Sequence, residues 1–168
     1  MNRVFTKTIL LRVFAFLATT VFSVALMNSL PRIKEQRQRS FARATMDGKV
    51  GRMRWLHFAG AKVDTRTSLG SPLFLAASSG KLRAVRYLLD EGAEVNCREA
   101  GGSSPLIEAA YNGHVEVIKE LLLRGAEVNA ISDYGTALDI AISRRNSATV
   151  EVLRHLGART TSEIRAGN

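Results

Sequence analysis

The residues that most often do chemistry in proteins are sparse in this chain, and their spacing does not bring them together. His57, His114 and His155 lie far apart, and none has a second ligand at the spacing of a metal site. We expect His57 and His155 on the surface and His114 in a structural role at a helix start. Cys97 is the only cysteine, and we expect it to be a small packed residue and not a nucleophile.

The acidic residues form no catalytic set either. Asp90, Glu91, Glu116 and Glu120 fall where a helix would face solvent, and Asp133 opens a turn. The sequence contains no G-x-S-x-G, H-E-x-x-H, P-loop or G-x-G-x-x-G motif. The sequence therefore predicts no catalytic residue, no metal site, no cofactor and no small-molecule substrate.

The chain repeats itself instead. Residues 79–97 read SGKLRAVRYLLDEGAEVNC, and 33 positions later residues 112–130 read NGHVEVIKELLLRGAEVNA. Fainter copies, displaced by 32 positions, read DGKVGRMRWLHFAGAKVD upstream and TALDIAISRRNSATVEVLRHLGA downstream. A period of this size is typical of a stacked array, in which each unit buries its apolar face only against its neighbours.

Each copy carries the signals of two short helices. Ser71, Ser104 and Thr136 can cap a first helix, and a proline follows the two serines at the first helical position. Paired alanines in this helix would let another helix approach closely. A glycine separates the first helix from a second helix, which has apolar residues at helical spacing. Another glycine ends the second helix. These glycines are Gly80 and Gly113 between the helices, and Gly92, Gly125 and Gly157 after them.

The segments SPLFLAASSGKLRAVRYLLDEGAEVN and SPLIEAAYNGHVEVIKELLLRGAEVNA resemble the ankyrin repeat family, whose pattern is T-P-L-H-x-A-A-x-x-G-H-x-E-V-V-x-L-L-L-x-x-G-A-D-V-N-A. The resemblance covers about residues 39–160. It implies an all-α fold, a helix-turn-helix solenoid of four stacked repeats with short projecting turns. Within a domain of residues 39–168, the repeats are about 39–70, 71–103, 104–135 and 136–160.

The sequence departs from the family pattern in three ways. Ala137 replaces the proline in the last unit. Phe74, Ile107 and Asp139 replace the histidine that follows Pro-Leu in the family. The turns before Ser71 and Thr136 are also one residue shorter than the central turn, so we expect them to be tighter.

The first 30 residues have a different composition. Three basic residues precede an apolar run from Val13 to Leu26, which is typical of a signal peptide or an N-terminal membrane anchor. Both interpretations stay open, and a buried core helix is a third. Residues 31–38 are expected to form a basic linker. We therefore predict an N-terminal apolar helix that contacts the membrane, and a membrane-associated or exported protein. The periplasmic or extracellular side is favoured, with the cytoplasmic side left open.

The positive charge gathers around this segment. The whole chain has a net charge of +9. Residues 1–45 hold eight Lys/Arg and one acid, hence +7, and residues 46–168 hold sixteen and fourteen, hence +2. Such charge flanking an apolar run sets membrane topology or contacts anionic headgroups. The basic run RIKEQRQR lacks interleaved aromatic residues, so no nucleic-acid partner is expected.

The resemblance implies that a protein partner binds to the projecting turns and to the concave face of the first helices. Tyr111 and Tyr134 are the best candidate anchors, because tyrosine and arginine are enriched in binding hot spots. The full set of candidate partner-binding residues is Arg66, Ser78, Ser79, Arg98, Glu99, Tyr111, Asn112, Asp133, Tyr134 and Arg144.

The function predicted from the sequence is a non-catalytic scaffold for protein–protein interaction. Two alternatives stay open. One is a secreted effector or inhibitor that occludes a target enzyme, and the other is an accessory subunit of a membrane-bound enzyme.

Overall fold

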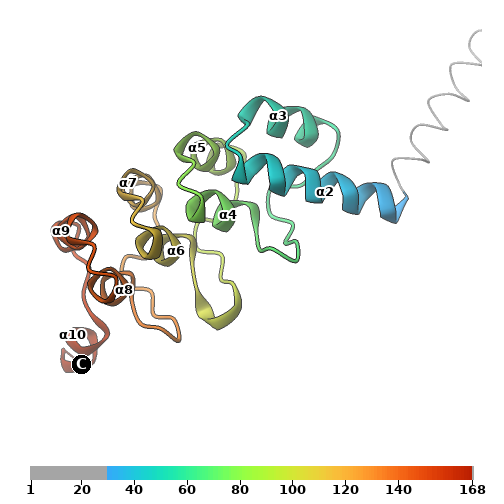
Figure 1. The fold of residues 1–168 in the computed structure, drawn as a ribbon. Helices are drawn as coiled ribbons and strands as arrows, with labels where there is room; N and C mark the ends of the chain where they lie inside the picture. Colours follow the sequence, from blue (N-terminus) through green and yellow to red (C-terminus); the bar gives the residue numbers. More distant parts are fainter. Residues whose placement is uncertain (1–29, 168) are drawn as a thin grey trace, which may run out of the picture. The chain divides into compact units, whose positions relative to one another are not determined.

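The computed structural model describes residues 30–167 of the 168-residue chain. Contacts within the chain divide it between Arg37 and Gln38, and the packing described below concerns residues 38–167. Figure 1 shows the order of the helices. They are α2 (Pro31–Met46), α3 (Val50–Phe58), α4 (Pro72–Ser78), α5 (Leu82–Asp90), α6 (Pro105–Asn112), α7 (Val115–Leu123), α8 (Ala137–Ser143), α9 (Ser147–His155) and α10 (Thr161–Ala166), with a 3-10 turn, η1 (Ala100–Gly102).

The predicted apolar helix of residues 1–30 lies outside the described residues except for Leu30, so it stays a prediction. Among the residues from 30 to 167, no helix has the length and apolar character needed to cross a bilayer. Residues 31–38, expected as a linker, form the first turns of α2. Pro31 suits the first helical position, and the Lys, Glu, Gln and Arg residues that follow are good helix formers.

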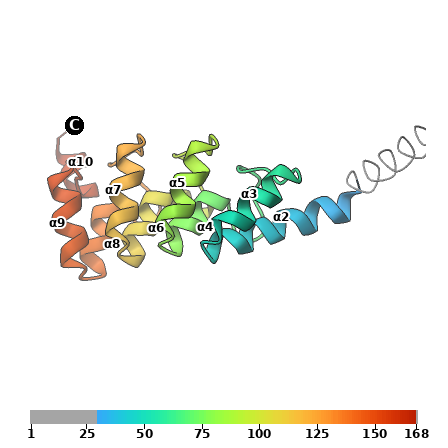
Figure 2. The same ribbon diagram turned by 90° about the horizontal axis from the view of Figure 1, so that it is seen from above.

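The helices from α3 to α9 form two rows. In the inner row α4 packs on α6 and α6 on α8, and in the outer row α3, α5, α7 and α9 pack in sequence (Figure 2). Each inner helix also packs on the outer helix that follows it in the chain. Over the described residues the chain forms no strand beyond two isolated bridges in turns. The predicted all-α helical repeat is therefore confirmed.

A single apolar core runs through the stack. Ala76 and Ala77 on α4, and Ala109 and Ala110 on α6, are fully buried. Their short side chains let the inner helices approach closely, as the sequence predicted. The same core takes in the end of α2 and the inward face of α3. Its largest fully buried side chains include Phe41, Met53, Leu73, Leu88, Leu106, Ile118, Leu121, Leu138 and Leu153.

The residue between the two helices of a unit has a positive φ in every unit. Gly113 has φ +75°, and a Cβ there would lie 2.1 Å from Nδ2 of Asn146 in the next unit. Arg145 occupies the matching place in the last unit with φ +55°. The next unit's side chain fills the space beside the glycine, so only the last unit can hold a larger residue there. Arg145 thus marks the end of the stack.

Two of the three expected helix caps are present. Ser104 Oγ accepts a hydrogen bond from the Ile107 amide at 3.3 Å, and Thr136 forms a capping box with Asp139. The expectation for Ser71 is wrong, because its side chain makes no cap bond. Its Oγ lies 3.3 Å from Sγ of Cys97 instead. Both side chains are buried, so the thiol takes the place of the helix amide as the hydrogen-bond partner of the hydroxyl.

The projecting turns differ in tightness as predicted. In the first, Thr67 and Gly70 exchange two backbone hydrogen bonds of 3.0 and 3.1 Å, and in the last Ser132 and Gly135 exchange two of 3.0 Å. The central turn is longer and contains η1. The single extra residue therefore replaces a closed tight turn with a wider one.

The expectation that Glu120 faces solvent is wrong. Its side chain is only 6% exposed, with Oε2 2.7 Å from Nε of Arg86 and Oε1 3.2 Å from Nε of Arg124. Arg124 also contacts Asp90 at 2.8 Å. A buried charge without partners costs free energy of folding. The two arginines offset this cost and allow the Glu120 carboxylate to be buried. The residues joined across α5 and α7 come from different repeats, so the sequence pattern of one helix could not show the pairing.

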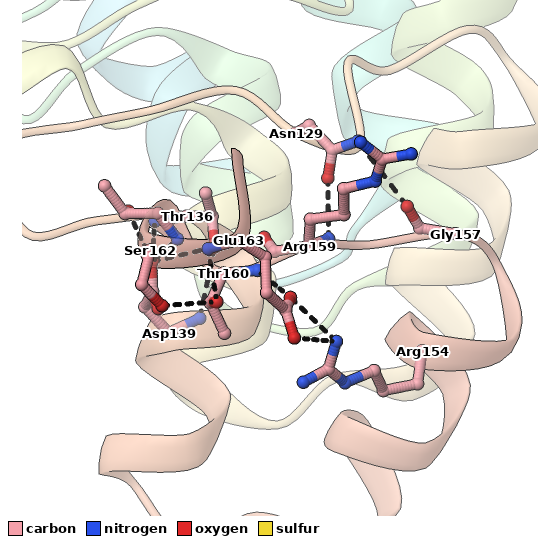
Figure 3. Close-up of polar contacts among 10 residues, drawn as sticks. Asn129, Thr136, Asp139, Arg154, Gly157, Arg159, Thr160, Ser162 and Glu163 are labelled. Atoms are coloured by element: carbon pink, nitrogen blue, oxygen red, sulfur yellow. Dashed lines mark hydrogen bonds and ion pairs between the residues drawn. The ribbon is translucent and has the colours of Figure 1, made fainter. Parts of the chain in front are cut away.

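A short C-terminal helix, α10, follows the last predicted repeat and was not expected (Figure 3). Asp139 Oδ2 accepts hydrogen bonds from the amide and hydroxyl of Thr161, at 2.8 and 2.5 Å, as well as from Thr136. Glu163 accepts from the Thr160 amide at 2.7 Å and pairs with Arg154 at 2.8 Å. Asp139, which replaces the family's histidine, thus holds α10 against the last unit.

These contacts set the ionisation of both carboxyls. Burial alone raises the pKa of Asp139, but the hydrogen bonds from Thr161 and Thr136 more than offset it, so the pKa is below its ordinary value of 3.8. The Thr160 amide, followed by Arg154, lowers the pKa of Glu163. A lowered pKa in the folded state means that folding favours the ionised form.

The first prediction concerns pH. The stability that Asp139 contributes should be fully present above its unfolded pKa, about 4, and should be lost as the pH falls through the lower folded value. Asp139→Ala should therefore cost about 2 kcal/mol near pH 7, in the range for hydrogen bonds to charged groups. The Tm of this variant should also fall less steeply than that of the wild type below about pH 4. Thermal melts from pH 7 to pH 3 measure both effects. Glu151→Ala, which removes an exposed carboxylate from α9, is the control, and equal pH profiles for the two variants would contradict the assignment.

The second prediction concerns the turn glycines. Gly113→Ala should destabilise the fold by about 2 kcal/mol or more, because it adds a clash with Asn146 to the strain of a positive φ. Gly125→Ala is the matched control, since Gly125 has φ +86° but nothing within 4 Å of the added Cβ. It should cost only the conformational strain, about 1 kcal/mol. Urea unfolding of both variants separates the two terms, and equal losses would rule out the clash.

Candidate functional site

The ten candidate residues fall into two groups on the fold. The turn cluster is Arg66, Arg98, Glu99, Asp133 and Tyr134, and it belongs to the three connecting turns that project on the same side of the helices in Figure 1. The helix-end cluster is Ser78, Ser79, Tyr111, Asn112 and Arg144, at the ends of the inner helices α4, α6 and α8.

Polar contacts join the helix-end cluster across neighbouring repeats. Ser78 on α4 donates to Glu108 Oε1 on α6 at 3.0 Å. Asn112 Nδ2 donates to the same carboxylate oxygen at 3.1 Å and to the Glu108 carbonyl at 3.0 Å. Glu108 thus fixes the rotamers of two candidate residues that sequence reasoning found, although it was itself missed. Its counterparts Leu75 and Ile140 are buried and apolar, and that break in the pattern is the signal that could have revealed it.

Tyr111 and Arg144 form the aromatic part of the helix-end cluster. The guanidinium carbon of Arg144 lies 4.2 Å from the centroid of the Tyr111 ring. Tyr111 keeps 44% of its surface exposed. A guanidinium stacked on an aromatic face is attracted to it by the ring quadrupole. Two side chains from neighbouring repeats therefore stack on each other at the surface while part of the ring stays open.

In the turn cluster, Arg66 and Glu99 connect the first turn to the second. The Arg66 guanidinium donates to the carbonyl of Arg98 and lies 3.7 Å from Glu99 Oε1. The same Glu99 oxygen accepts the backbone amide of Ser71 at 2.9 Å. Glu99 is largely buried by these contacts. The structure therefore gives Glu99 a role inside the chain.

Arg98 connects the second turn to the third. Its Nη1 donates to the carbonyls of Gly102 and Ile131, both at 3.1 Å, and its Nη2 lies 3.0 Å from Glu127 Oε2. The Asp133 amide donates to the Gly101 carbonyl at 2.9 Å. The donors of Arg98 are thus engaged by its own chain, and the second and third turns are fixed to each other.

Tyr134 is the exposed aromatic residue of the turn cluster, with 77% of its surface open. Its backbone amide is held by Ser132 Oγ at 3.3 Å, so its position at the turn is fixed while its ring stays accessible. Leu69 and Ile131 are also exposed on the projecting turns, and sequence reasoning missed both. An apolar residue inside an otherwise polar turn is the signal that could have found Leu69.

The remaining reactive residues have structural roles. Burial raises the pKa of the Cys97 thiol, and a hydrogen bond with Ser71 lowers it only in part, so little reactive thiolate forms near neutral pH. His114 Nε2 lies 3.0 Å from the Ser78 carbonyl in the preceding unit, in agreement with its predicted structural role. His57 is half-buried, with Nδ1 2.9 Å from the Ala61 carbonyl. Within residues 30–167, no three His, Cys, Asp or Glu side chains are grouped as a metal site.

Comparison with known families agrees with this geometry. A family model described as ankyrin repeats (3 copies) matches residues 41–132 and again residues 73–164. The chain belongs to the ankyrin repeat family. The sequence matches none of the curated proteins with which it was compared. Ankyrin repeats form modules for protein–protein interaction, so the candidate residues lie on a scaffold of that class.

The third prediction separates structural from exposed members of the turn cluster. Glu99→Ala should lower the free energy of unfolding by about 1–3 kcal/mol, because it leaves the Ser71 amide without its acceptor. Asp133→Ala removes a carboxylate from the exposed tip of the next ankyrin turn and should change stability by no more than about 0.5 kcal/mol. Urea unfolding of the two variants measures the difference. A stable Glu99→Ala variant would show that the turn contact contributes little to the fold.

Proposed function

We propose that the protein is a non-catalytic scaffold that binds a protein partner through the exposed parts of the helix-end cluster and the turn cluster. The observation that supports this most strongly is the Tyr111–Arg144 pair, held across two repeats with the ring still open. A side chain that already packs on a neighbour loses less conformational freedom on binding than one without such a contact. Tyr134 supplies a second exposed aromatic ring, on a projecting turn.

The contacts divide the candidate residues by the role we assign them. Arg98 and Glu99 hold the turns in place, and Ser78 and Asn112 hold Glu108. Tyr111, Tyr134 and Arg144 make the direct contact in this proposal, with Leu69 and Ile131 as apolar neighbours. This arrangement agrees with the general rule that a few central aromatic and arginine residues supply most of the binding energy.

We further propose that the repeats are tethered to a membrane or exported across it. The apolar run from Val13 to Leu26, with basic residues on both sides, supports this location. Mass spectrometry of the mature N-terminus separates the two forms, because a tethered chain keeps residues 1–30 and a released chain loses them. A protein that keeps the segment and remains in the soluble fraction of disrupted cells would contradict both.

The fourth prediction tests the binding surface. Crosslinking and co-purification of the full chain identify the partner, and a titration then measures its affinity. Tyr111→Ala and Tyr134→Ala should each weaken binding by about 2 kcal/mol or more, some thirtyfold in Kd, while leaving Tm almost unchanged.

Lys119→Ala on the outer helix α7 is the matched control, because Lys119 is exposed and pairs only with its neighbour Glu116 at 2.9 Å. Arg86→Ala is unsuitable, because it removes a partner of the buried Glu120. If Lys119→Ala abolishes binding and the tyrosine variants bind normally, the partner uses the outer helices and the proposed surface is wrong.

A further inference from the structure

Helix α3 presents an aromatic stripe to solvent. Met53 and Leu56 are buried against the stack, whereas Trp55 is 66% exposed and Phe58 is 91% exposed. Gly51, Trp55 and Phe58 are spaced i, i+4 and i+7, so they lie on one face of the helix. This face points away from the core, opposite Met53 and Leu56.

The exposed aromatic residues of the stripe occur in the first unit only, and the equivalent positions of the later units do not repeat them. At the position of Trp55, α5 has Tyr87, which is buried. At the position of Phe58, α5 has Asp90, and α7 has Leu123. In Figure 2, α3 is the first helix of the outer row, so its packing is that of an end unit. Stacking therefore does not require two large exposed aromatic rings here, and they call for another explanation.

Positive charge flanks the stripe. Arg52 and Arg54 are exposed on its two sides, and α3 itself has no acidic residue. The carboxylate recorded against α3 is that of Glu91 in the next unit, 3.7 Å from Nε2 of His57. The nearest acid in the sequence, Asp47, is paired with Lys49 at 2.9 Å. Residues 39–63 hold six Lys/Arg and one acid, hence +5, whereas residues 64–168 hold twelve and thirteen, hence −1. The basic charge of the repeat domain is thus concentrated in its first unit.

We propose that the exposed face of α3 lies against an anionic lipid bilayer. Trp55 and Phe58 would enter the boundary between headgroups and acyl chains, where aromatic side chains are enriched, and Arg52 and Arg54 would contact lipid phosphates. A protein partner or a second copy of the chain could also cover the aromatic rings. The arginines on both sides of the rings, with no carboxylate on α3 itself, favour the anionic surface.

This inference rests on the proposed membrane location and not on the proposed partner surface. The apolar run from Val13 to Leu26 precedes α2 and α3 in the same chain, so a tether would keep the first unit near the bilayer. Contact through α3 would then leave the helix-end cluster on the inner helices free for a protein partner.

The chain has a single tryptophan, so its fluorescence reports on Trp55 alone. The full chain is purified in detergent and reconstituted with vesicles of phosphatidylcholine, either pure or mixed with phosphatidylglycerol. Each composition is made with and without acyl-brominated lipid, which quenches tryptophan at the bilayer. In the anionic vesicles the emission of Trp55 should move to shorter wavelength and be quenched. Arg52→Gln/Arg54→Gln should weaken the quenching that depends on phosphatidylglycerol, by about fivefold in partitioning for each charge.

A matched reporter on another helix is the control. Leu123 is exposed on α7, so Trp55→Phe/Leu123→Trp moves the only tryptophan to a second exposed position on the outer row. Its emission should stay at the wavelength of an exposed tryptophan, with little quenching, in the same vesicles. Sedimentation of the vesicles shows in parallel whether the chain is attached at all.

The outcomes separate the two ideas. If the chain sediments but Trp55 is quenched no more than the Leu123→Trp reporter, the tether stands and the α3 contact is wrong. If it sediments only with anionic vesicles and Trp55 is quenched, the α3 contact stands and the apolar anchor is wrong. If it sediments with neither composition, both are wrong. A wavelength shift in detergent alone that grows with protein concentration would indicate a second copy on α3 and would overturn the inference.

Discussion

The packing of the inner helices, which carry fully buried alanines where a larger side chain would not fit, is the constraint on which the other features depend. A unit of two short helices cannot exclude water from its own apolar face, so its stability comes from the units on each side. The alanines set the distance between α4, α6 and α8. That distance is short enough for Ser78 to reach Glu108 and for Arg144 to stack on Tyr111. The candidate surface is therefore a product of the packing beneath it.

The parts of the fold that follow the period could be predicted from the sequence. The helices, the left-handed glycines and the difference between tight and wide turns each depend on a residue type at a repeated position. When the same residue type recurs at the same position of several repeats, the conformation that it serves can be inferred without a structure. The same reasoning located the two exposed tyrosines, because both lie outside the pattern at positions that face away from the core.

The parts that could not be predicted depend on a contact between one unit and the next. Ser71 makes no cap bond, and its hydroxyl is instead hydrogen-bonded to the thiol of Cys97, 26 positions later. Glu120 can be buried because Arg86 reaches it from the preceding outer helix. Asp139 departs from the family pattern, and its reason is visible only once α10 supplies Thr161. In each case the pair of residues in contact occurs at one place in the array only, so the repeated pattern holds no information about it.

The side chain of Arg145 bears on how such an array can change in length. Repeat proteins lengthen when a unit is duplicated, and every internal unit must leave room for the residue that caps the next second helix. A copy of residues 104–135 inserted in the middle would bring its own Gly113 and fit its neighbours. A unit added after the last one would meet the Arg145 side chain in the space that Asn146 fills beside Gly113. The array can therefore grow from within, but growth at its C-terminal end requires changes both at Arg145 and at α10, which Asp139 holds against the last unit.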